Sequence, residues 1–229
     1  MSLKSYLAPK TIETFQSQYN GEVTVVQLPK LITGGKPKLK VMAGGLLQSG
    51  SIITQLWEKP LQSITNYQLP ITNVLLLGLG GGTIVKMLNK RFPKSTITAI
   101  EIDPVMITIA KKYYGLKPSK KLNIIQADAF KFVKTYKQNP ISYDLIIVDL
   151  FAGDSQPDQL YTKTFHHNLQ KLLSQNGIII FNRLFFDQHK KRTHDFIQTI
   201  DPIYQQISLV KSLSNLFVIA KNIIVWKKT

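Results

Sequence analysis

The strongest constraint on the fold is a change of rhythm that begins at Asn73. From there on, short apolar runs alternate with stretches of helical periodicity, so that each expected strand is followed by a helix. The expected strands lie at 73–79, 96–102, 122–127, 143–151 and 177–186. The expected helices lie at 83–92, 104–114, 128–137 and 158–174. Strands this apolar are buried on both faces, which predicts a mostly parallel sheet covered by helices on each side.

Both ends of the chain depart from this alternation of strands and helices. Residues 207–226 hold apolar runs without a long helix between them, which predicts an antiparallel pair that ends the sheet. Near the start, 21–28 alternates and is rich in β-branched residues, and 31–48 holds two Gly-Gly turns, both typical of hairpins. We therefore expect a small N-terminal β-hairpin unit in residues 1–70 and a doubly wound α/β domain in residues 71–229.

Composition narrows the class of protein. The chain has 229 residues, is 44% hydrophobic and 18% charged, and therefore resembles an ordinary globular protein. The absence of cysteine excludes disulfides, thiolate zinc sites and a cysteine nucleophile. The sequence has no apolar run of the roughly 18 residues that a membrane span needs, and we expect no secretory signal in its first residues. We expect a cytoplasmic protein without a membrane partner and without a bound metal.

The formal net charge of +16 comes almost entirely from lysine. Such a charge can serve a polyanion partner such as RNA, or it can be a compositional bias spread over the surface. Lysines run from Lys4 to Lys228 without a long block, which favours the dispersed surface over an RNA partner.

The first expected strand of the main domain ends in a cluster of glycines. Gly78, Gly80, Gly81 and Gly82 stand within five positions of one another, immediately before a helix. In a doubly wound sheet, ligands bind beyond the carboxyl ends of the strands, and glycine lets the backbone turn tightly and approach the ligand closely. The string departs from the dinucleotide fingerprint G-x-G-x-x-G/A, because its sixth position is Thr83.

The next three strands end in carboxylates. Glu101 follows the glycines by about 20 residues, where a carboxylate can accept hydrogen bonds from both hydroxyls of a ribose. Asp128, which precedes Ala129, can accept from an adenine amino group and can also cap the following helix. Asp149 ends the fourth strand, and Asp154 lies at its rim. Three carboxylates at one sheet edge suit a ligand with a diol, an amine and a cationic centre.

The order of these motifs resembles a known family. EIDP, ADA and the antiparallel finish resemble the seven-stranded S-adenosylmethionine-binding fold of class I methyltransferases. The whole order is similar to the spermidine synthase family, whose members are aminopropyltransferases on that fold. VLLLGLGGGT stands where that family has VLVIGGGDGG, VDLFAGD stands where it has VDSSDP, and GGLLQ stands where it has DGVIQ.

The resemblance implies a cofactor and a set of residues that bind it. The cofactor is S-adenosylmethionine or its decarboxylated form, with S-adenosylhomocysteine or methylthioadenosine as the product. The implied cofactor-binding residues are Gly78, Gly80, Gly81, Gly82, Glu101, Asp128, Ala129 and Asp149. Asn20 is a further candidate for this pocket.

The part of the site that the resemblance implies would bind amine groups departs from the family pattern. Gly81 takes the place of an aspartate near the amine end of the cofactor, and Ala152 takes the place of the catalytic aspartate. Asp154, two residues further on, can replace that aspartate only in a reshaped loop. Trp57 stands where the family has a tyrosine that faces the polyamine.

Three functions remain open. The first is aminopropyl transfer to a polyamine-like amine, with Asp149 and Asp154 holding the cationic amine and accepting its proton. The second is methyl transfer to RNA or a small metabolite. The third is a non-catalytic module that binds an adenosyl group or a polyanion. We expect His166 and His167 on the surface, and Tyr161 either faces the acceptor or packs under the loop.

The N-terminal unit is too short to bury a core of its own. Its apolar residues can pack on the main domain or on the same unit of a second chain. The candidates are Val23, Val25, Leu39, Val41 and Leu46. The family resemblance implies the second arrangement, so we expect a homodimer with a two-fold interface.

Overall fold

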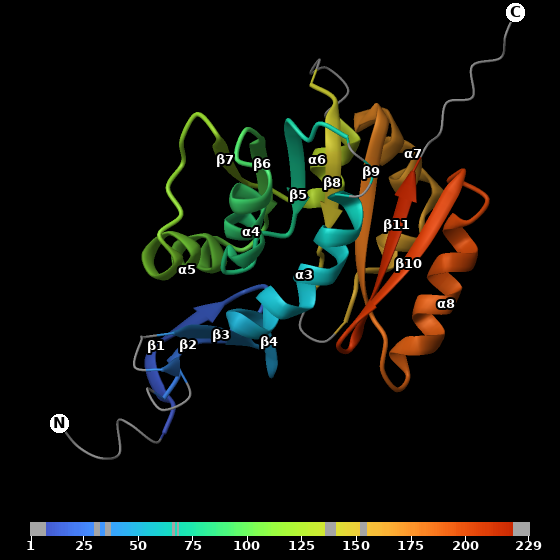
Figure 1. The fold of residues 1–229 in the computed structure, drawn as a ribbon. Helices are drawn as coiled ribbons and strands as arrows, with labels where there is room; N and C mark the ends of the chain where they lie inside the picture. The colour runs from blue at the N-terminus through green and yellow to red at the C-terminus, as the bar shows by residue number, and fades with distance from the viewer. Residues whose placement is uncertain are drawn as a thin grey trace, which may run out of the picture.

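The computed structural model describes residues 8–29, 33–34, 38–65, 67, 69–135, 141–151 and 155–221. At its centre is a seven-stranded sheet in the order β10-β11-β9-β8-β5-β6-β7 (Figure 1). Five of its strands run parallel: β5 (Asn73–Leu77), β6 (Thr96–Glu101), β7 (Leu122–Gln126), β8 (Tyr143–Val148) and β9 (Leu173–Leu184). β10 (Gln206–Ser212) and β11 (Asn215–Lys221) form a hairpin, and β11 runs antiparallel to β9. The predicted sheet and its antiparallel finish are confirmed.

Helices cover both faces of this sheet. One layer consists of α3 (Ser51–Thr65), α4 (Thr83–Arg91) and α5 (Pro104–Tyr114). The other consists of α6 (Ala129–Thr135), α7 (Lys163–Leu172) and α8 (His189–Ile200). Along β5, Leu76 packs into the first layer and Leu77 into the second, and both are fully buried. The apolar strands therefore build two cores, and the doubly wound α/β fold is confirmed.

Several elements differ from the sequence-based expectation. Neither α3 nor α8 was predicted, and β9 begins earlier than residue 177. The continuous helix expected over 158–174 is wrong, because a 3₁₀ helix η2 (Asp158–Tyr161) and then α7 occupy this stretch. Thr162 separates the two, since its hydroxyl accepts a hydrogen bond from the Phe165 amide (3.4 Å) and caps α7.

The N-terminal segment forms a second, four-stranded antiparallel sheet in the order β1-β2-β3-β4. Its strands are β1 (Lys10–Ser17), which was not predicted, β2 (Gly21–Gln27), β3 (Leu39–Ala43) and β4 (Leu46–Ser49). Gly44 and Gly45 connect β3 to β4 with positive φ angles of 55° and 77°, so this Gly-Gly turn is confirmed. Of the other Gly-Gly pair, Gly35 lies outside the described residues.

The small sheet packs on α5 of the main domain. Val23, Val25 and Val41 are 0% exposed and contact Met106 and Ile109 of that helix. At the edge of this contact, the Lys112 ammonium lies 2.6 Å from the Glu13 carboxylate. This apolar face is therefore covered within one chain, which removes the packing argument for a second copy.

Two organisational expectations stay predictions after this observation. The homodimer now depends on the family resemblance alone. The division of the chain at residue 70 also stays a prediction, since α3 precedes that position in the sequence but packs on the large sheet.

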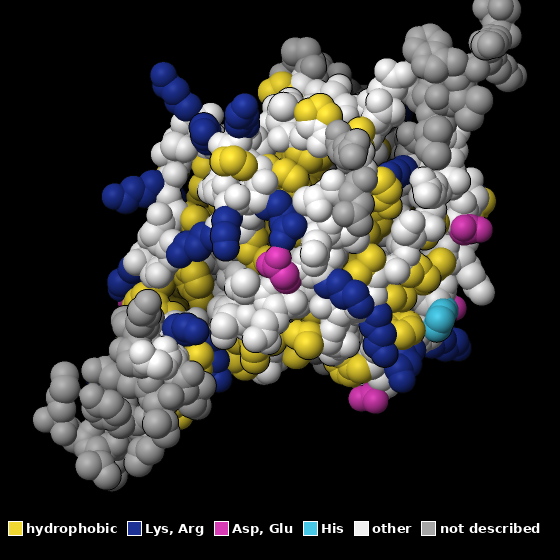
Figure 2. All heavy atoms as spheres, in the orientation of Figure 1, with side chains coloured by type: hydrophobic (Ala, Val, Ile, Leu, Met, Phe, Trp, Pro, Cys, Tyr) yellow, Lys and Arg dark blue, Asp and Glu magenta, His cyan; other side chains and the backbone are white. Residues whose placement is uncertain are grey.

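Basic side chains are distributed over the surface. Figure 2 shows Lys and Arg spread across the face that it presents, with few acidic residues between them. Among the described residues, no helix is both long enough and apolar enough to cross a lipid bilayer.

Candidate functional site

A cavity of about 250 Å³ opens at the carboxyl ends of β5, β6 and β8. The chain reverses its winding here, because β6 and β7 lie on one side of β5 and β8 lies on the other. This is the place where open α/β sheets bind their ligands. Six residues predicted from the ends of the strands line the cavity, namely Gly78, Gly80, Glu101, Asp128, Ala129 and Asp149.

Gly78 brings the ends of β5 and β8 into contact. Its φ is +94°, and a Cβ at this position would lie 2.1 Å from the carbonyl oxygen of Asp149. Both the backbone angle and the close approach require glycine here. The glycine turn thereby shapes the floor of the cavity.

The structure places the other two glycines outside the cavity wall. A Cβ on Gly81 would lie 2.3 Å from the Ser49 hydroxyl oxygen, and one on Gly82 would lie 2.3 Å from a methyl carbon of Leu116. These glycines let β4 and the segment after α5 pack against the start of α4.

Glu101 holds the glycine turn in place. Its Oε2 accepts hydrogen bonds from the amides of Leu79 (3.0 Å) and Gly80 (3.1 Å), and its Oε1 accepts one from the amide of Asp103 (3.0 Å). Burial raises the pKa of this carboxyl, and the three backbone donors lower it in part. A carboxylate has about four lone-pair sites, so three donors leave one for a ligand in the cavity.

The small sheet supplies one wall of the cavity through a contact with Asp103. The Asp103 carboxylate accepts hydrogen bonds from the Ser17 hydroxyl (2.6 Å) and the Asn20 side-chain amide (2.6 Å). Its other oxygen accepts from the Val105 amide (2.8 Å) and caps α5. The turn between β1 and β2 is thereby held at the cavity, where Asn20 lines the wall.

Asp128 caps α6 and also faces the cavity. Its Oδ1 accepts hydrogen bonds from the amides of Phe130 (2.8 Å) and Lys131 (3.0 Å), which confirms the predicted cap. The side chain is half-buried and lines the cavity, so its second oxygen is available to a ligand.

Asp149 lies between this cavity and a second one of about 210 Å³. Its Oδ1 accepts a hydrogen bond from the side-chain amide of Asn182 (2.8 Å), and the oxygen of Asn182 accepts one from the amide of Asn215 (2.7 Å). Burial raises the pKa of Asp149 to about 6, the Asn182 hydrogen bond lowers it, and the nearby charge of Glu101 raises it further. This carboxylate is therefore mostly ionised at neutral pH but titrates closer to it than an ordinary aspartate does.

The lining of the first cavity is acidic. Among the described residues, it includes three carboxylates and no Lys, Arg or His side chain. This local charge is opposite in sign to the net charge of +16 on the whole chain. A cationic ligand therefore fits the cavity better than an anionic one.

Two further expectations have different outcomes. Asp154, the second predicted catalytic residue, lies outside the described residues, as does Ala152. The expected surface position of His166 is wrong, because its ring is fully buried between the Leu160 carbonyl (2.7 Å) and the Tyr204 hydroxyl (3.1 Å). Burial lowers the pKa of His166 to about 4, whereas His167 is exposed as expected.

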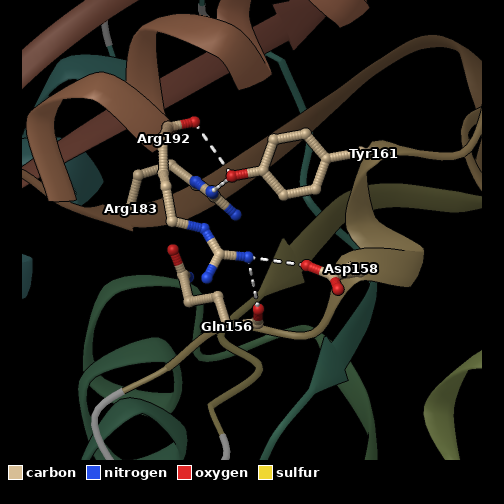
Figure 3. A network of polar contacts seen from close by, with 5 residues as sticks. All are labelled: Gln156, Asp158, Tyr161, Arg183 and Arg192. Carbon is tan, nitrogen blue, oxygen red and sulfur yellow. Dashed lines mark hydrogen bonds and ion pairs between the residues drawn. The ribbon is translucent and has the colours of Figure 1, made fainter.

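Tyr161 lines neither cavity and packs edge-on against Phe196 of α8. Its hydroxyl accepts a hydrogen bond from the Arg183 guanidinium (2.6 Å) and donates one to the Arg192 carbonyl (2.9 Å) (Figure 3). The Arg192 guanidinium in turn contacts Asp158 (2.6 Å) and the carbonyl of Gln156 (3.4 Å). This network fixes the segment 156–161, from which Pro157 and Gln159 reach the cavity wall.

Sequence reasoning missed the residues that join the two cavities. Gln48, at the end of β4, lines both of them, and Asn182 and Asn215 line the second. Gln48 had a signal, because it is part of the GGLLQ segment. Asn182 had a weaker one, since it is a polar residue within an apolar strand.

Comparison with known proteins assigns the chain to a family. Residues 56–226 match the family model described as Spermine/spermidine synthase domain, which is more than half of the chain. The chain belongs to the spermine/spermidine synthase family. The crystal structure of a probable spermidine synthase from Corynebacterium glutamicum shares its fold, with a TM-score of 0.77 at 14% identity over 91% of this chain and 79% of that one.

Curated relatives in this family and beside it cover parts of the chain. A polyamine aminopropyltransferase of Vibrio vulnificus is 34% identical over 109 residues, which are 48% of this chain and 36% of that protein. An eEF1A lysine and N-terminal methyltransferase homolog of Drosophila melanogaster is 32% identical over 123 residues, which are 51% of this chain and 18% of that protein. The matched part thus spans well under two thirds of either relative's length.

Proposed function

We propose that the chain is a transferase that binds an S-adenosyl sulfonium compound in the first cavity and transfers its aminopropyl group to a small amine. Membership of the spermine/spermidine synthase family supports an aminopropyl donor. The arrangement of the cavity supports a nucleoside, because the glycine turn, Glu101 and Asp128 follow one another along the switch point of the sheet.

The acidic lining carries the choice of aminopropyl transfer. Decarboxylated S-adenosylmethionine has a sulfonium and an ammonium and lacks the carboxylate of S-adenosylmethionine. The three carboxylates of the described cavity wall, with no cationic side chain beside them, favour the ligand with the greater positive charge. The charge of the cavity is the single observation on which this choice rests.

Each carboxylate has a proposed role. The free lone pair of Glu101 accepts from a ribose hydroxyl, and the second oxygen of Asp128 accepts from the adenine amino group. When bound, the sulfonium supplies an electrophilic carbon with a good leaving group, so the protein's main contribution is alignment of the nucleophile. Asp149, between the two cavities, holds the incoming amine and accepts its proton, for which its raised pKa of about 6 suits it near neutral pH.

Methyl transfer is the second candidate function. Position 81 carries glycine and packs against Ser49, so no side chain reaches the cavity from it. The similarity to the methyltransferase homolog of Drosophila favours the same reaction. A methyl donor keeps its carboxylate, so the relative affinity for the carboxylated and decarboxylated cofactors separates the two functions.

Calorimetric titration tests the proposed cofactor. The ligands are S-adenosylmethionine, its decarboxylated form, S-adenosylhomocysteine and methylthioadenosine. We expect binding with preference for the decarboxylated donor, followed by formation of an aminopropylated amine. Preference for the carboxylated donor with methylated product would assign methyl transfer. Binding without any transfer would leave the adenosyl-binding module, and no binding of the four compounds by folded protein would refute the proposal.

Asp128→Asn tests the adenine contact without removing the helix cap. Asparagine caps helices as well as aspartate does, so α6 should stay folded. Its amide group donates rather than accepts at the second position, which should weaken nucleoside binding by about 1–3 kcal/mol. Glu58→Gln is the matched control, because Glu58 is exposed on α3 and pairs with Arg91 away from both cavities.

A further inference from the structure

A diamine carries two positive charges, and the wall of the second cavity is unusual for a site that would bind such a ligand. Among the described residues that line it, Asp149 is the single charged side chain. It lines the first cavity as well, whereas the other described residues of the lining are apolar or carry an uncharged amide or hydroxyl group. A cation at the far end of this cavity would therefore meet no carboxylate of the described wall.

The amide side of the cavity is a directed chain of hydrogen bonds. The Ser214 hydroxyl donates to the oxygen of Asn215 (2.9 Å), the amide of Asn215 donates to the oxygen of Asn182 (2.7 Å), and the amide of Asn182 donates to Asp149 (2.8 Å). Each amide oxygen thus already accepts a hydrogen bond, and each donor points toward Asp149. The chain fixes one carboxylate oxygen, and each amide oxygen keeps one further lone pair, so the described wall offers a second ammonium neutral oxygens but no second carboxylate.

The apolar part of the lining is partly open to solvent. It comes from β4, α3, the end of β9 and the β10–β11 hairpin, with Leu47, Ile52, Leu56, Trp57, Phe186 and Leu213. Ile52 is 54% exposed and Leu213 is 56% exposed, so two large apolar side chains stand at the mouth of the cavity. Exposed apolar side chains gathered at a cavity mark a surface that binds an apolar group.

The backbone conformation of Leu213 also supports the binding of an apolar group at this cavity. It is the first residue of the two-residue turn between Ser212 and Asn215, and its φ is +49°. Such a turn favours glycine at this position, because a side chain is strained there. The strained residue in this turn is a leucine whose side chain lies at the mouth of the second cavity.

We propose that the second cavity accepts a substrate with one amine and an uncharged, largely apolar body, its nitrogen placed at Asp149. This assignment rests on the proposed transfer function and holds for either transferred group. Asp149 takes one proton from the ammonium. The freed lone pair of the nitrogen forms the new C–N bond, and the C–S bond breaks with its electron pair left on sulfur as a neutral thioether. The product is a secondary ammonium, and Asp149 later releases its proton to water.

The test compares n-hexylamine with 1,6-diaminohexane, which have the same carbon chain and differ in the second charge. Binding to the full chain is followed by intrinsic tryptophan fluorescence, with and without methylthioadenosine, and transfer is followed by mass spectrometry of the product. We expect the monoamine to bind and react at least about tenfold better than the diamine. Equal or better use of the diamine, or binding of neither amine, would overturn the proposal. Methylthioadenosine titration without an amine tests the proposed cofactor site by itself, so failure of that site is distinguishable from failure of the amine assignment.

A charged variant supplies an independent readout. Leu213→Glu adds a carboxylate at the mouth of the cavity, on a side chain that is already exposed, and Leu213→Gln is its uncharged control. An exposed ion pair should improve diamine binding relative to monoamine binding by about fivefold in the Glu variant and not in the Gln variant. An unchanged ratio of the two amines would show that the far end of the cavity does not contact them.

Discussion

Replacing Asp149 by asparagine should stabilise the free protein while removing transfer activity. Burial raises the pKa of this carboxyl from its ordinary value of 3.8 to about 6, so the folded chain resists its ionisation. One pKa unit corresponds to about 1.4 kcal/mol, which sets the cost of the ionised side chain at about 3 kcal/mol at most. The half-buried side chain keeps part of its hydration, so we expect a gain in the free energy of unfolding of about 1–3 kcal/mol in Asp149→Asn. Asparagine still offers an oxygen to Asn182.

The pH dependence has a defined sign. Below about pH 4, Asp149 is protonated in the folded and the unfolded chain, and the two proteins should be about equally stable. Between about pH 4 and about pH 6 the unfolded chain releases the proton and the folded chain keeps it, so the wild type loses stability relative to the variant as the pH rises. Above about pH 6 the difference should be constant.

Urea unfolding of both proteins from about pH 4 to about pH 8 measures this difference, since other titrating groups affect both alike. Asp144→Asn is the control of opposite sign. Burial raises the pKa of Asp144, but hydrogen bonds from Thr72, Asn73 and Ser174 outweigh it and leave the pKa below its ordinary value. Its stabilisation is present above the ordinary pKa of 3.8 and is lost only as the pH falls below it, so Asp144→Asn should lower the free energy of unfolding by a nearly constant amount over the measured range. A wild-type-to-Asp149→Asn difference that stays flat over this range would refute the reasoning.

Three further outcomes follow from the structure. Gly78→Ala should lower the free energy of unfolding by about 3 kcal/mol or more, because its Cβ would lie 2.1 Å from a carbonyl oxygen. Gly115→Ala, which has open space around the added Cβ, should lower it by about 1–2 kcal/mol. Urea unfolding measures both changes. Trp57→Ala should cost about 3–5 kcal/mol by the same measurement, because Trp57 is 0% exposed and packs edge-on against Phe217. The homodimer implied by family resemblance should appear in light scattering after size exclusion, and a mass near 26.0 kDa would exclude it.

The strand ends were predictable because they follow from geometry. Once strands alternate with helices, the residues after each strand must meet at one edge of the sheet, which is why Gly78, Glu101, Asp128 and Asp149 came together as expected. The family resemblance added the cofactor class, which residue types alone do not specify.

Other features depended on contacts that a linear pattern does not show. Helix α3 contains Pro60, which argues against a helix in the sequence, yet the burial of its apolar face against the large sheet overrides this preference. Asn182 donates to Asp149, and the pairing of β9 with β11 brings Asn215 to Asn182. His166 was expected outside because its neighbours are polar, but it belongs to the buried face of α7.

The contact of Asp103 with the turn after β1 makes the cavity a product of two sheets. Ser17 and Asn20 are separated from Asp103 by 86 and 83 positions, and all three must meet before the wall beside Glu101 is complete. Closing such long loops is entropically costly, so we expect this wall to form late in folding and to open early during unfolding by heat or denaturant. A nucleoside bound across this wall should hold the two sheets together. Slowed hydrogen exchange in β1 and β2 on addition of the nucleoside would then report both its binding and the docking of the small sheet.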